Sequence, residues 1–312
     1  MGLPRAVARL LMEEGKRRPF AGAVLELGRS FVYLGRAEIE HWAARHGFAL
    51  APVAWTPSHV PDLAAQGCVD DRSFFGALGF SEVRSCDISD WEGADLLVDL
   101  NLPVPAELHG RFDAVFDIGT LTHVFDQRTA WRNIFDLVKP GGRVIHGVAP
   151  SSNHVDIGFF MFSPTLFADF YATNGWRIET MYFCEFDAWW VRGRMMSAPW
   201  RVYRYTPGCL DALRAGGLRR RQYAVFVVAT KVDGATGDRI PMQGWYREFF
   251  ASHGTRVAGE SAAQGANSGA GAAAAPASTA RPPSPALALW KRLRAAAVRR
   301  LPPKMPPLVG RY

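Results

Sequence analysis

Acidic residues and glycines recur directly after short apolar runs in the first half of the chain. An ionised carboxylate accepts hydrogen bonds from several ligand hydroxyls, and glycine lets the backbone approach a ligand closely. In an open α/β sheet, ligands bind beyond the carboxyl ends of the parallel strands. The residues that end the predicted strands are therefore the candidate site: Glu26, Gly28, Asp87, Asp99, Asn101, Asp117, Gly119 and Thr120.

Two histidines near these positions are candidates for acid–base catalysis. His123 follows the fourth predicted strand, and His154 lies with Asp156 in the segment SSNHVDIGFF. Imidazole changes its protonation near neutral pH, so either ring is a candidate general base, with Asp117 as a third catalytic candidate. Local packing at a helix start is the simpler role for His123, and we favour it. A solvated loop explains His154 and Asp156 equally well.

The elements that must position these residues alternate between two patterns. Apolar runs bounded by turn residues predict strands, and apolar residues at helical spacing predict helices between them. This alternation predicts an α/β fold: a Rossmann-like, doubly wound, mostly parallel seven-stranded sheet. No patterned helix separates the last two strands, so we expect them to pair antiparallel. The predicted strands are 23–28, 82–87, 94–99, 112–119, 143–150, 176–186 and 221–232.

The predicted helices carry recognisable ends. The segment DDRSFFGALGF has Asp70 or Asp71 as its N-cap and Gly79 as its stop. The segment SPTLFADFYATNGW begins at a Ser-Pro pair and ends at Gly175. Residues 36–48 and 127–138 complete the set, while the Pro-rich stretch between 49 and 69 shows no period and predicts a loop.

Five successive segments resemble the motifs of class I S-adenosylmethionine-dependent methyltransferases. They are VLELG, CDIS, ADLLVDLNLPVP, FDAVFDIGTLTHVFD and LVKPGGRVIHGVAP. The resemblance covers about residues 20–184 and is closest to a branch associated with bacterial cell-surface polysaccharide and glycosylation enzymes. It implies S-adenosylmethionine as cofactor and methylation of a hydroxyl on a saccharide or another small molecule.

The same resemblance implies a role for each candidate residue. Glu26 and Gly28 would flank the methionine part of the cofactor, Asp87 would hold the ribose, and Asp99 with Asn101 would lie near the adenine. The segment from Asp117 through Gly119 to Thr120 would line the cleft of methyl transfer.

The chain departs from the family pattern after the first strand. Gly28 is followed by Arg29-Ser30-Phe31, where the family usually has Gly-x-Gly, and Thr122 stands where Glu often precedes the histidine. The alternative is therefore a catalytically inactive, methyltransferase-like binding or scaffold domain. A nicotinamide-dependent oxidoreductase is disfavoured because no G-x-G-x-x-G follows the first strand.

The formal net charge of +7 belongs mainly to the end of the chain. From Ser261 onward there are eight Lys or Arg residues and no Asp or Glu. The rest of the chain is nearly neutral, so we expect no nucleic-acid partner. The basic segment 286–312 predicts either an amphipathic helix with weak affinity for anionic membranes or a solubilising tail.

Composition divides the chain into four parts. We expect an N-terminal helix over 1–19, a methyltransferase-like domain over 20–251, a disordered Ala/Gly/Ser/Pro linker over 252–285, and the basic tail. Within the domain, 185–221 interleaves Trp and Tyr with Arg, which predicts an acceptor lid or a cover for the sheet. Four isolated cysteines indicate reduced thiols and no metal centre. We expect a cytoplasmic protein, with a peripheral place at the inner membrane face as the alternative.

Overall fold

The computed structural model describes residues 2–187, 198–211, 213, 217–218, 221–254 and 305–312. These residues fall into two compact units. The first contains residues 1–211, 219–241 and 305–312, and the second contains 212–218 and 242–304. The candidate site residues all belong to the first unit.

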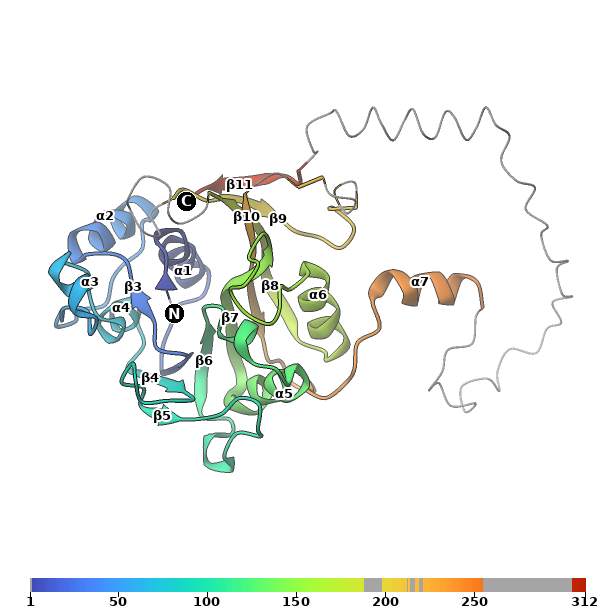
Figure 1. Cartoon of the computed structure of the whole chain (residues 1–312), viewed down its shortest axis with the longest axis horizontal. Helices are drawn as coiled ribbons and strands as arrows, with labels where there is room; N and C mark the ends of the chain where they lie inside the picture. Colours follow the sequence, from blue (N-terminus) through green and yellow to red (C-terminus); the bar gives the residue numbers. More distant parts are fainter. Residues whose placement is uncertain (1, 188–197, 212, 214–216, 219–220, 255–304) are drawn as a thin grey trace, which may run out of the picture. The chain divides into compact units, whose positions relative to one another are not determined.

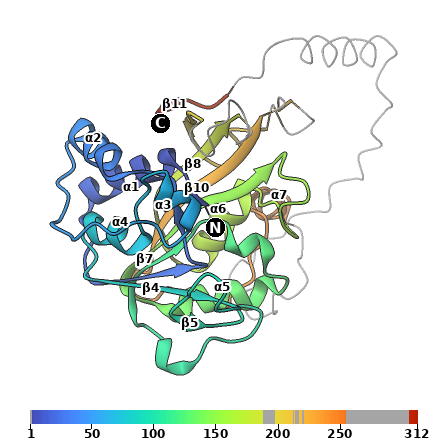
Figure 2. The same cartoon turned by 60° about the vertical axis from the view of Figure 1, so that its left-hand side comes forward.

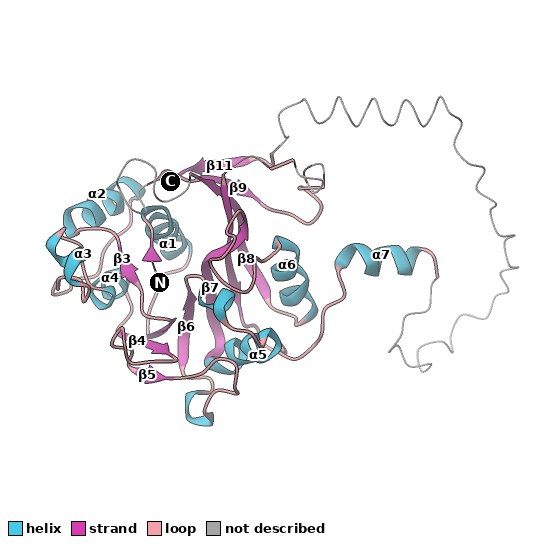
Figure 3. Cartoon of the chain, in the orientation of Figure 1, coloured by secondary structure: helices cyan, strands magenta, loops and turns pink. Residues whose placement is uncertain are grey.

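The described part of the first unit contains a nine-stranded mixed sheet (Figure 3). Its strands in chain order are β2 (Ala23–Leu27), β4 (Glu82–Asp87), β5 (Leu96–Leu97), β6 (Phe112–Asp117), β7 (Val138–Ser152), β8 (Arg177–Phe186), β9 (Arg201–Arg204), β10 (Gln222–Thr230) and β11 (Leu308–Arg311). Their spatial order is β11-β9-β8-β10-β7-β6-β2-β4-β5. A separate parallel pair joins β1 (Gly2–Leu3) to β3 (Phe31–Val32).

Helices cover both faces of this sheet (Figures 1 and 2). In Figure 1 the blue helices α1, α2, α3 and α4 lie on one side of the sheet, and the green helices α5 and α6 lie on the other. Their bounds are α1 (Arg5–Arg17), α2 (Arg36–His46), α3 (Pro61–Ala65), α4 (Asp71–Leu78), α5 (Gln127–Leu137) and α6 (Pro164–Thr173), with 3₁₀ turns η1 (Ala106–Leu108) and η2 (Thr120–His123). The predicted doubly wound α/β architecture is confirmed in this coarse form.

The predicted caps explain where two of these helices begin and end. Asp70 accepts a hydrogen bond from the backbone N–H of Arg72 at the start of α4, and Gly79 ends the helix with φ 119°. Ser163 accepts from Thr165 at the start of α6. Side-chain oxygens satisfy N–H groups that have no partner within the helix, and a left-handed residue is cheapest as glycine.

The parallel core and the antiparallel final pair are also as predicted. β2 pairs in parallel with β4 and β6, β4 with β5, and β6 with β7. β10 runs antiparallel to both β7 and β8. The connection from β4 to β5 contains no helix, so a short extended link makes this parallel crossover.

The predicted number of seven strands is wrong because two further strands extend the sheet beyond β8. β9 pairs antiparallel with β8, and β11 pairs antiparallel with β9. β9 comes from the aromatic and Arg-rich segment 185–221. In its described part Trp200 is 3% exposed and stacks on Phe186, so these rings cover the sheet. Trp189, Trp190, Arg192 and Arg194 lie outside the described residues.

Of the predicted basic tail 286–312, the last eight residues are described, and they contain the strand β11. β11 pairs with a sheet edge, and the backbones of Tyr312 and Trp200 exchange hydrogen bonds of 2.7 and 2.9 Å. The Tyr312 ring is buried, and its hydroxyl donates to Glu13 Oε2 at 2.9 Å. The unpaired edge of β9 offers backbone partners that favour a strand over a helix. The remaining tail residues through 304 and the linker from 255 lie outside the described residues.

The N-terminal helix α1 packs into the same hydrophobic core as the sheet. Its residues Val7, Leu10, Leu11 and Met12 are at most 1% exposed. The predicted loop 49–69 contains the short helix α3. No helix in the described part of the chain has both the length and the apolar content needed to cross a membrane.

The described part of the second unit is mainly helix α7 (Gly244–Ser252), which the sequence analysis did not predict. Its aromatic side chains stack along the helix, with the rings of Trp245 and Phe249 5.3 Å apart. None of its residues is buried.

Replacing Tyr312 with Ala should destabilise the first unit. The change removes a buried ring, its stacking on His46 and its hydrogen bond to Glu13. Aromatic-to-Ala changes in cores lower the free energy of unfolding by about 3–5 kcal/mol. The loss here should be smaller, because β11 can detach from the sheet edge without unfolding the rest. Tyr312→Phe, which keeps the ring, should lose only about 1 kcal/mol. Urea unfolding followed by circular dichroism measures both; equal midpoints for wild type and Tyr312→Ala would show that β11 contributes no stability.

Candidate functional site

The carboxyl ends of β2, β4 and β6 meet at one edge of the sheet, as predicted. Leu27 is in register with both Cys86 and Asp117. The backbone N–H of Gly28 donates to the carbonyl of Cys86 at 2.7 Å, and the Thr120 hydroxyl donates to the carbonyl of Leu27. The turns that follow these three strands are therefore immediate neighbours.

This edge is also where the strand order reverses. From β2, the chain places β4 and β5 on one side and β6 and β7 on the other. Gly28 is the first residue after β2 and has φ 75°, a left-handed conformation that glycine adopts without strain. A crevice at such a switch point is the usual ligand site of doubly wound sheets.

Asp87 ends β4 with a half-buried carboxylate. Its Oδ1 accepts a hydrogen bond from the Ser89 backbone at 3.2 Å, and Oδ2 has no hydrogen-bond partner among the described residues. The neighbouring Ile88 is 70% exposed, and Trp91 is 90% exposed. Asp87 therefore presents a free acceptor beside two exposed apolar surfaces.

Asp99 and Asn101 form a local hydrogen-bonded turn after β5. Asp99 Oδ1 accepts from the Asn101 backbone at 2.9 Å and from its Nδ2 at 2.8 Å. Asn101 Oδ1 in turn accepts from the backbones of Phe125 and Asp126, both at 2.9 Å. The pair thus ties this turn to the start of α5, and the Asn101 amide oxygen is already used.

The Asp117 side chain points into the protein. It is 1% exposed, its Oδ1 accepts from Gly119, and its Oδ2 lies 2.9 Å from His146 Nδ1. His146 Nε2 lies 2.6 Å from the hydroxyl of Tyr171 on α6. Both Asp117 oxygens are engaged internally, so this carboxylate holds the turn after β6. The predicted catalytic role has no geometric support, because a buried, fully bonded carboxylate cannot reach a substrate.

Glu26 is completely buried within β2. Among the described residues, neither carboxylate oxygen has a partner in full hydrogen-bond geometry, but Ser30 and Asp71 lie close enough to act on its ionisation. Burial and the adjacent charge of Asp71 raise the pKa of Glu26 well above its ordinary value, which favours the neutral acid. A ligand in the crevice has no direct access to this side chain.

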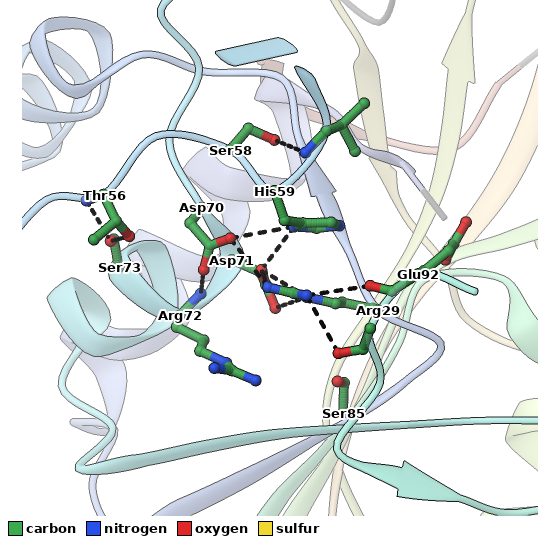
Figure 4. A network of polar contacts seen from close by, with 12 residues as sticks. Arg29, Thr56, Ser58, His59, Asp70, Asp71, Arg72, Ser73, Ser85 and Glu92 are labelled. Carbon is green, nitrogen blue, oxygen red and sulfur yellow. Dashed lines mark hydrogen bonds and ion pairs between the residues drawn. The ribbon is translucent and has the colours of Figure 1, made fainter. Parts of the chain in front are cut away.

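The Arg29 side chain extends into a buried polar network (Figure 4). Its guanidinium contacts Asp71 at 3.2 Å and Asp70 at 3.1 Å, and donates to the carbonyls of Glu92 and Gly93. Gly93 permits this approach, because a Cβ there would lie 2.9 Å from Arg29 Nη1. Arg29 stands at the variable position of Gly-x-Gly and Ser30 at its second glycine, and the loop after β2 buries both side chains.

His59 closes the network from the other side. Its Nδ1 lies 3.2 Å from Asp70 Oδ2 and 3.2 Å from Asp71 Oδ1. Burial opposes the charged form of His59, but its contacts with the two carboxylates outweigh burial and raise its pKa. Burial likewise opposes ionisation of Asp71, and the hydrogen bonds from His59 and Arg29 outweigh it and lower the pKa. These contacts favour the charged forms of both His59 and Asp71.

The ligand atoms of His59, Asp70 and Asp71 lie within 4.8 Å of one another, a spacing that suits a metal ion. The Arg29 guanidinium already contacts both carboxylates and so compensates part of their charge without an ion. An open cavity of about 530 Å³ borders it, lined by Arg29, His59, Asp70, Arg72 and residues between Val53 and Pro57. None of the predicted cofactor-binding residues lines this cavity.

The two candidate histidines have opposite environments. His123 is exposed at the end of η2. His154 is 7% exposed, packs against Phe186, and has a buried Nε2 without a hydrogen-bond partner in the described part of the chain. Burial lowers the pKa of His154, which favours the neutral imidazole. Of the two alternatives left open for His154, the solvated loop does not fit this side chain, because it is buried against Phe186.

The Arg29–Asp70–Asp71–His59 network was not predicted. The sequence identified Asp70 or Asp71 as a helix cap and Arg29 as a departure from the family pattern, but it gave no sign that these residues meet. The adjacent Asp-Asp pair at a helix start, facing a strand-end Arg, is the only available signal. The network can be recognised only once the packing of α4 against β4 is known, because that packing brings the aspartates to Arg29.

Replacing Glu26 with Gln should change how stability depends on pH. A folded-state pKa above the unfolded one gives stability that is present at low pH and lost as pH rises. Gln cannot ionise, so the stability of Glu26→Gln relative to wild type should increase between pH 4.5 and pH 8. Urea unfolding of both proteins at the two pH values measures this, and a pH-independent difference would show that Glu26 ionises freely when folded.

Replacing Arg29 with Ala should strongly destabilise the fold. It leaves Asp70 and Asp71 buried with one cation, and removal of one partner of a buried pair costs about 3–5 kcal/mol. Arg72→Ala is the matched control, because Arg72 is half exposed and its pair with Asp95 should contribute at most about 1 kcal/mol. Equal losses in the two variants, measured by denaturant unfolding, would contradict the central role of Arg29.

Comparison with known proteins gives structural matches only. No protein-family model matches the sequence, and no curated protein matches it. An Archaeoglobus fulgidus S-adenosylmethionine-dependent methyltransferase matches 72% of this chain and 94% of its own, with 12% identity and a TM-score of 0.33. A Burkholderia thailandensis 1,6-didemethyltoxoflavin N1-methyltransferase matches 73% and 79%, with 15% identity and a TM-score of 0.28.

A third match is a Methanococcus maripaludis protein described as an S-adenosylmethionine-dependent methyltransferase. It has 14% identity and a TM-score of 0.26, and this chain spans only 54% of its length. All three similar structures carry methyltransferase descriptions, and none points to polysaccharide enzymes. At these TM-scores the likeness assigns no activity to this chain, so function must be argued from the site itself.

Proposed function

We propose that this chain is an S-adenosylmethionine-dependent methyltransferase that methylates a hydroxyl of a saccharide or another small molecule. The observation that carries the proposal is the position of Asp87. Its half-buried carboxylate has a free oxygen at the strand-order switch point, beside the left-handed Gly28. A carboxylate in this place suits the hydroxyls of a ribose.

The remaining residues fit the nucleoside half of the cofactor better than its amino-acid half. Exposed Ile88 next to Asp87 offers an apolar surface for a base, and the second oxygen of Asp99 has no partner among the described residues. On the other side, Glu26 is sealed in the core. The backbone around Gly28 would therefore bind the methionine part of the cofactor. The bound cofactor would supply the methyl group, and the chain would supply binding and orientation.

Deprotonation of a hydroxyl acceptor is assigned to one of the two histidines. His154 is held neutral by burial, as a base must be, but its Nε2 is covered in this conformation. His123 is open to solvent at the end of the turn that follows β6. His123 is the candidate that a substrate can reach without a conformational change, so His123→Ala should reduce turnover more than cofactor affinity.

A catalytically inactive binding or scaffold domain is the second candidate. The inward orientation of Asp117 and the buried Glu26 favour it, because both acidic candidates are withdrawn from the crevice. Binding of S-adenosylmethionine without transfer to any offered saccharide or small-molecule hydroxyl would support this candidate. Binding of NAD alone would support the oxidoreductase that the sequence disfavours.

The Asp87→Asn variant tests the proposed cofactor site. Hydrogen bonds to a charged acceptor contribute about 1.5–3 kcal/mol each, so this variant should bind S-adenosylmethionine and S-adenosylhomocysteine at least tenfold more weakly. Its melting temperature without ligand should barely change, because the carboxylate is a half-buried strand-end group. Isothermal titration calorimetry measures the affinities.

The control for this experiment is Asp90→Asn, which removes the same charge from an exposed position three residues further along the same turn. It should keep wild-type affinity. Equal weakening in the two variants would mean that net charge, and not the Asp87 carboxylate, governs binding. Tight wild-type binding that Asp87→Asn leaves unchanged would reject the assigned site.

A further inference from the structure

A second cavity lies between α5 and α6, on the face of the sheet opposite α1 and α2. Its volume is about 680 Å³, within the range of about 300–1,000 Å³ that is typical of small-molecule sites. Figure 1 shows α5 and α6 as neighbours on this face, and the rings of Trp131 on α5 and Phe170 on α6 are 4.7 Å apart. None of the predicted cofactor or catalytic residues lines this cavity.

Aromatic and aliphatic side chains form most of its wall. Trp131, Phe162 and Phe170 are each at most 7% exposed, and Phe160 and Leu166 add further apolar surface. The indole N–H of Trp131 already donates to Gln127 Oε1 at 3.2 Å. The cavity wall therefore offers few free hydrogen-bonding groups and suits the hydrophobic part of a ligand.

The charged residues of the lining are three arginines and one aspartate. Arg132 pairs with Asp136 at 3.0 Å and lies 3.6 Å from Asp238, so its charge is compensated. The guanidinium groups of Arg128 and Arg239 make no hydrogen bond or ion pair with the described residues. Two exposed cations without an ion-pair partner in the described residues thus stand at an apolar cavity, with Asp126 close enough to Arg128 for their charges to interact. This combination favours an anionic head attached to a hydrophobic body.

We infer that this cavity binds an amphipathic anion, with its hydrophobic body against Trp131 and Phe170 and its carboxylate or phosphate paired with Arg128 and Arg239. Neutral and cationic amphiphiles of the same length lack the ion pairs. The site is separate from the strand-end crevice, so this inference stands or falls independently of cofactor binding.

Binding of four twelve-carbon probes to the full-length protein tests the inference. Dodecanoate and dodecyl phosphate carry the expected anionic heads, and 1-dodecanol and dodecyltrimethylammonium are the neutral and cationic comparisons. Isothermal titration below the concentrations at which the probes aggregate should give affinities at least tenfold higher for the two anions. A preference between the anions identifies whether the head is a carboxylate or a phosphate.

Variants connect the binding to this cavity. Arg128→Ala combined with Arg239→Ala should weaken dodecanoate at least fivefold and leave 1-dodecanol unchanged. Arg36→Ala combined with Arg45→Ala is the matched control, since it removes two exposed arginines from α2 on the opposite face. Leu166→Trp, which fills the cavity, should abolish binding of the anions while the protein stays folded by circular dichroism.

Tryptophan fluorescence supplies an independent readout. A dodecanoate brominated at its terminal carbon should quench Trp131, and because the chain has ten tryptophans, the signal is defined as the quenching lost in Trp131→Phe. Equal affinities for all four probes, equal weakening in both double-arginine variants, or unchanged quenching in Trp131→Phe would each overturn the inference. Absence of any anion binding would overturn it as well.

Discussion

The contact of the Arg29 guanidinium with Asp70 and Asp71 holds the candidate site together. Arg29 follows the first core strand, the two aspartates begin α4, and the carbonyls that Arg29 also reaches belong to the turn before β5. One side chain therefore fixes three segments around the strand-end crevice. Because the group is almost fully buried, the two carboxylates depend on it and on His59 for compensation. The geometry of the loop after β2 depends on this pairing.

The sheet order determines which groups face a ligand. Strands placed on both sides of β2 bring Gly28, Asp87 and Thr120 to one edge, and backbone hydrogen bonds fix their mutual positions. Within that edge, burial separates the acidic residues into two sets. Asp87 remains open to a ligand, whereas Asp117 holds a turn. Glu26 lies in the core, where its raised pKa favours the protonated, neutral form. The side chain that remains open at this edge is therefore a hydrogen-bond acceptor, and the two buried carboxylates are withdrawn from acid–base chemistry with a ligand.

The sequence by itself determined the local elements of this protein. Apolar runs located the core strands, and the caps at Asp70 and Ser163 located the starts of α4 and α6. These signals are local, because a cap satisfies N–H groups within the same turn and an apolar run marks its own burial. Strand-end residues could be brought to one edge by the same reasoning, since parallel strands share their direction.

Only the tertiary structure decided which way the side chains at that edge point. Asp87 and Asp117 both end core strands, yet Asp87 is half-buried with a free oxygen, whereas Asp117 contacts His146, which in turn contacts Tyr171. The burial of Arg29 required the packing of α4, and the strand at 308–311 required the free edge of β9. These outcomes depend on partners brought together by long-range packing. No local pattern of residue types encodes such partners, so folding of the whole sheet fixes them.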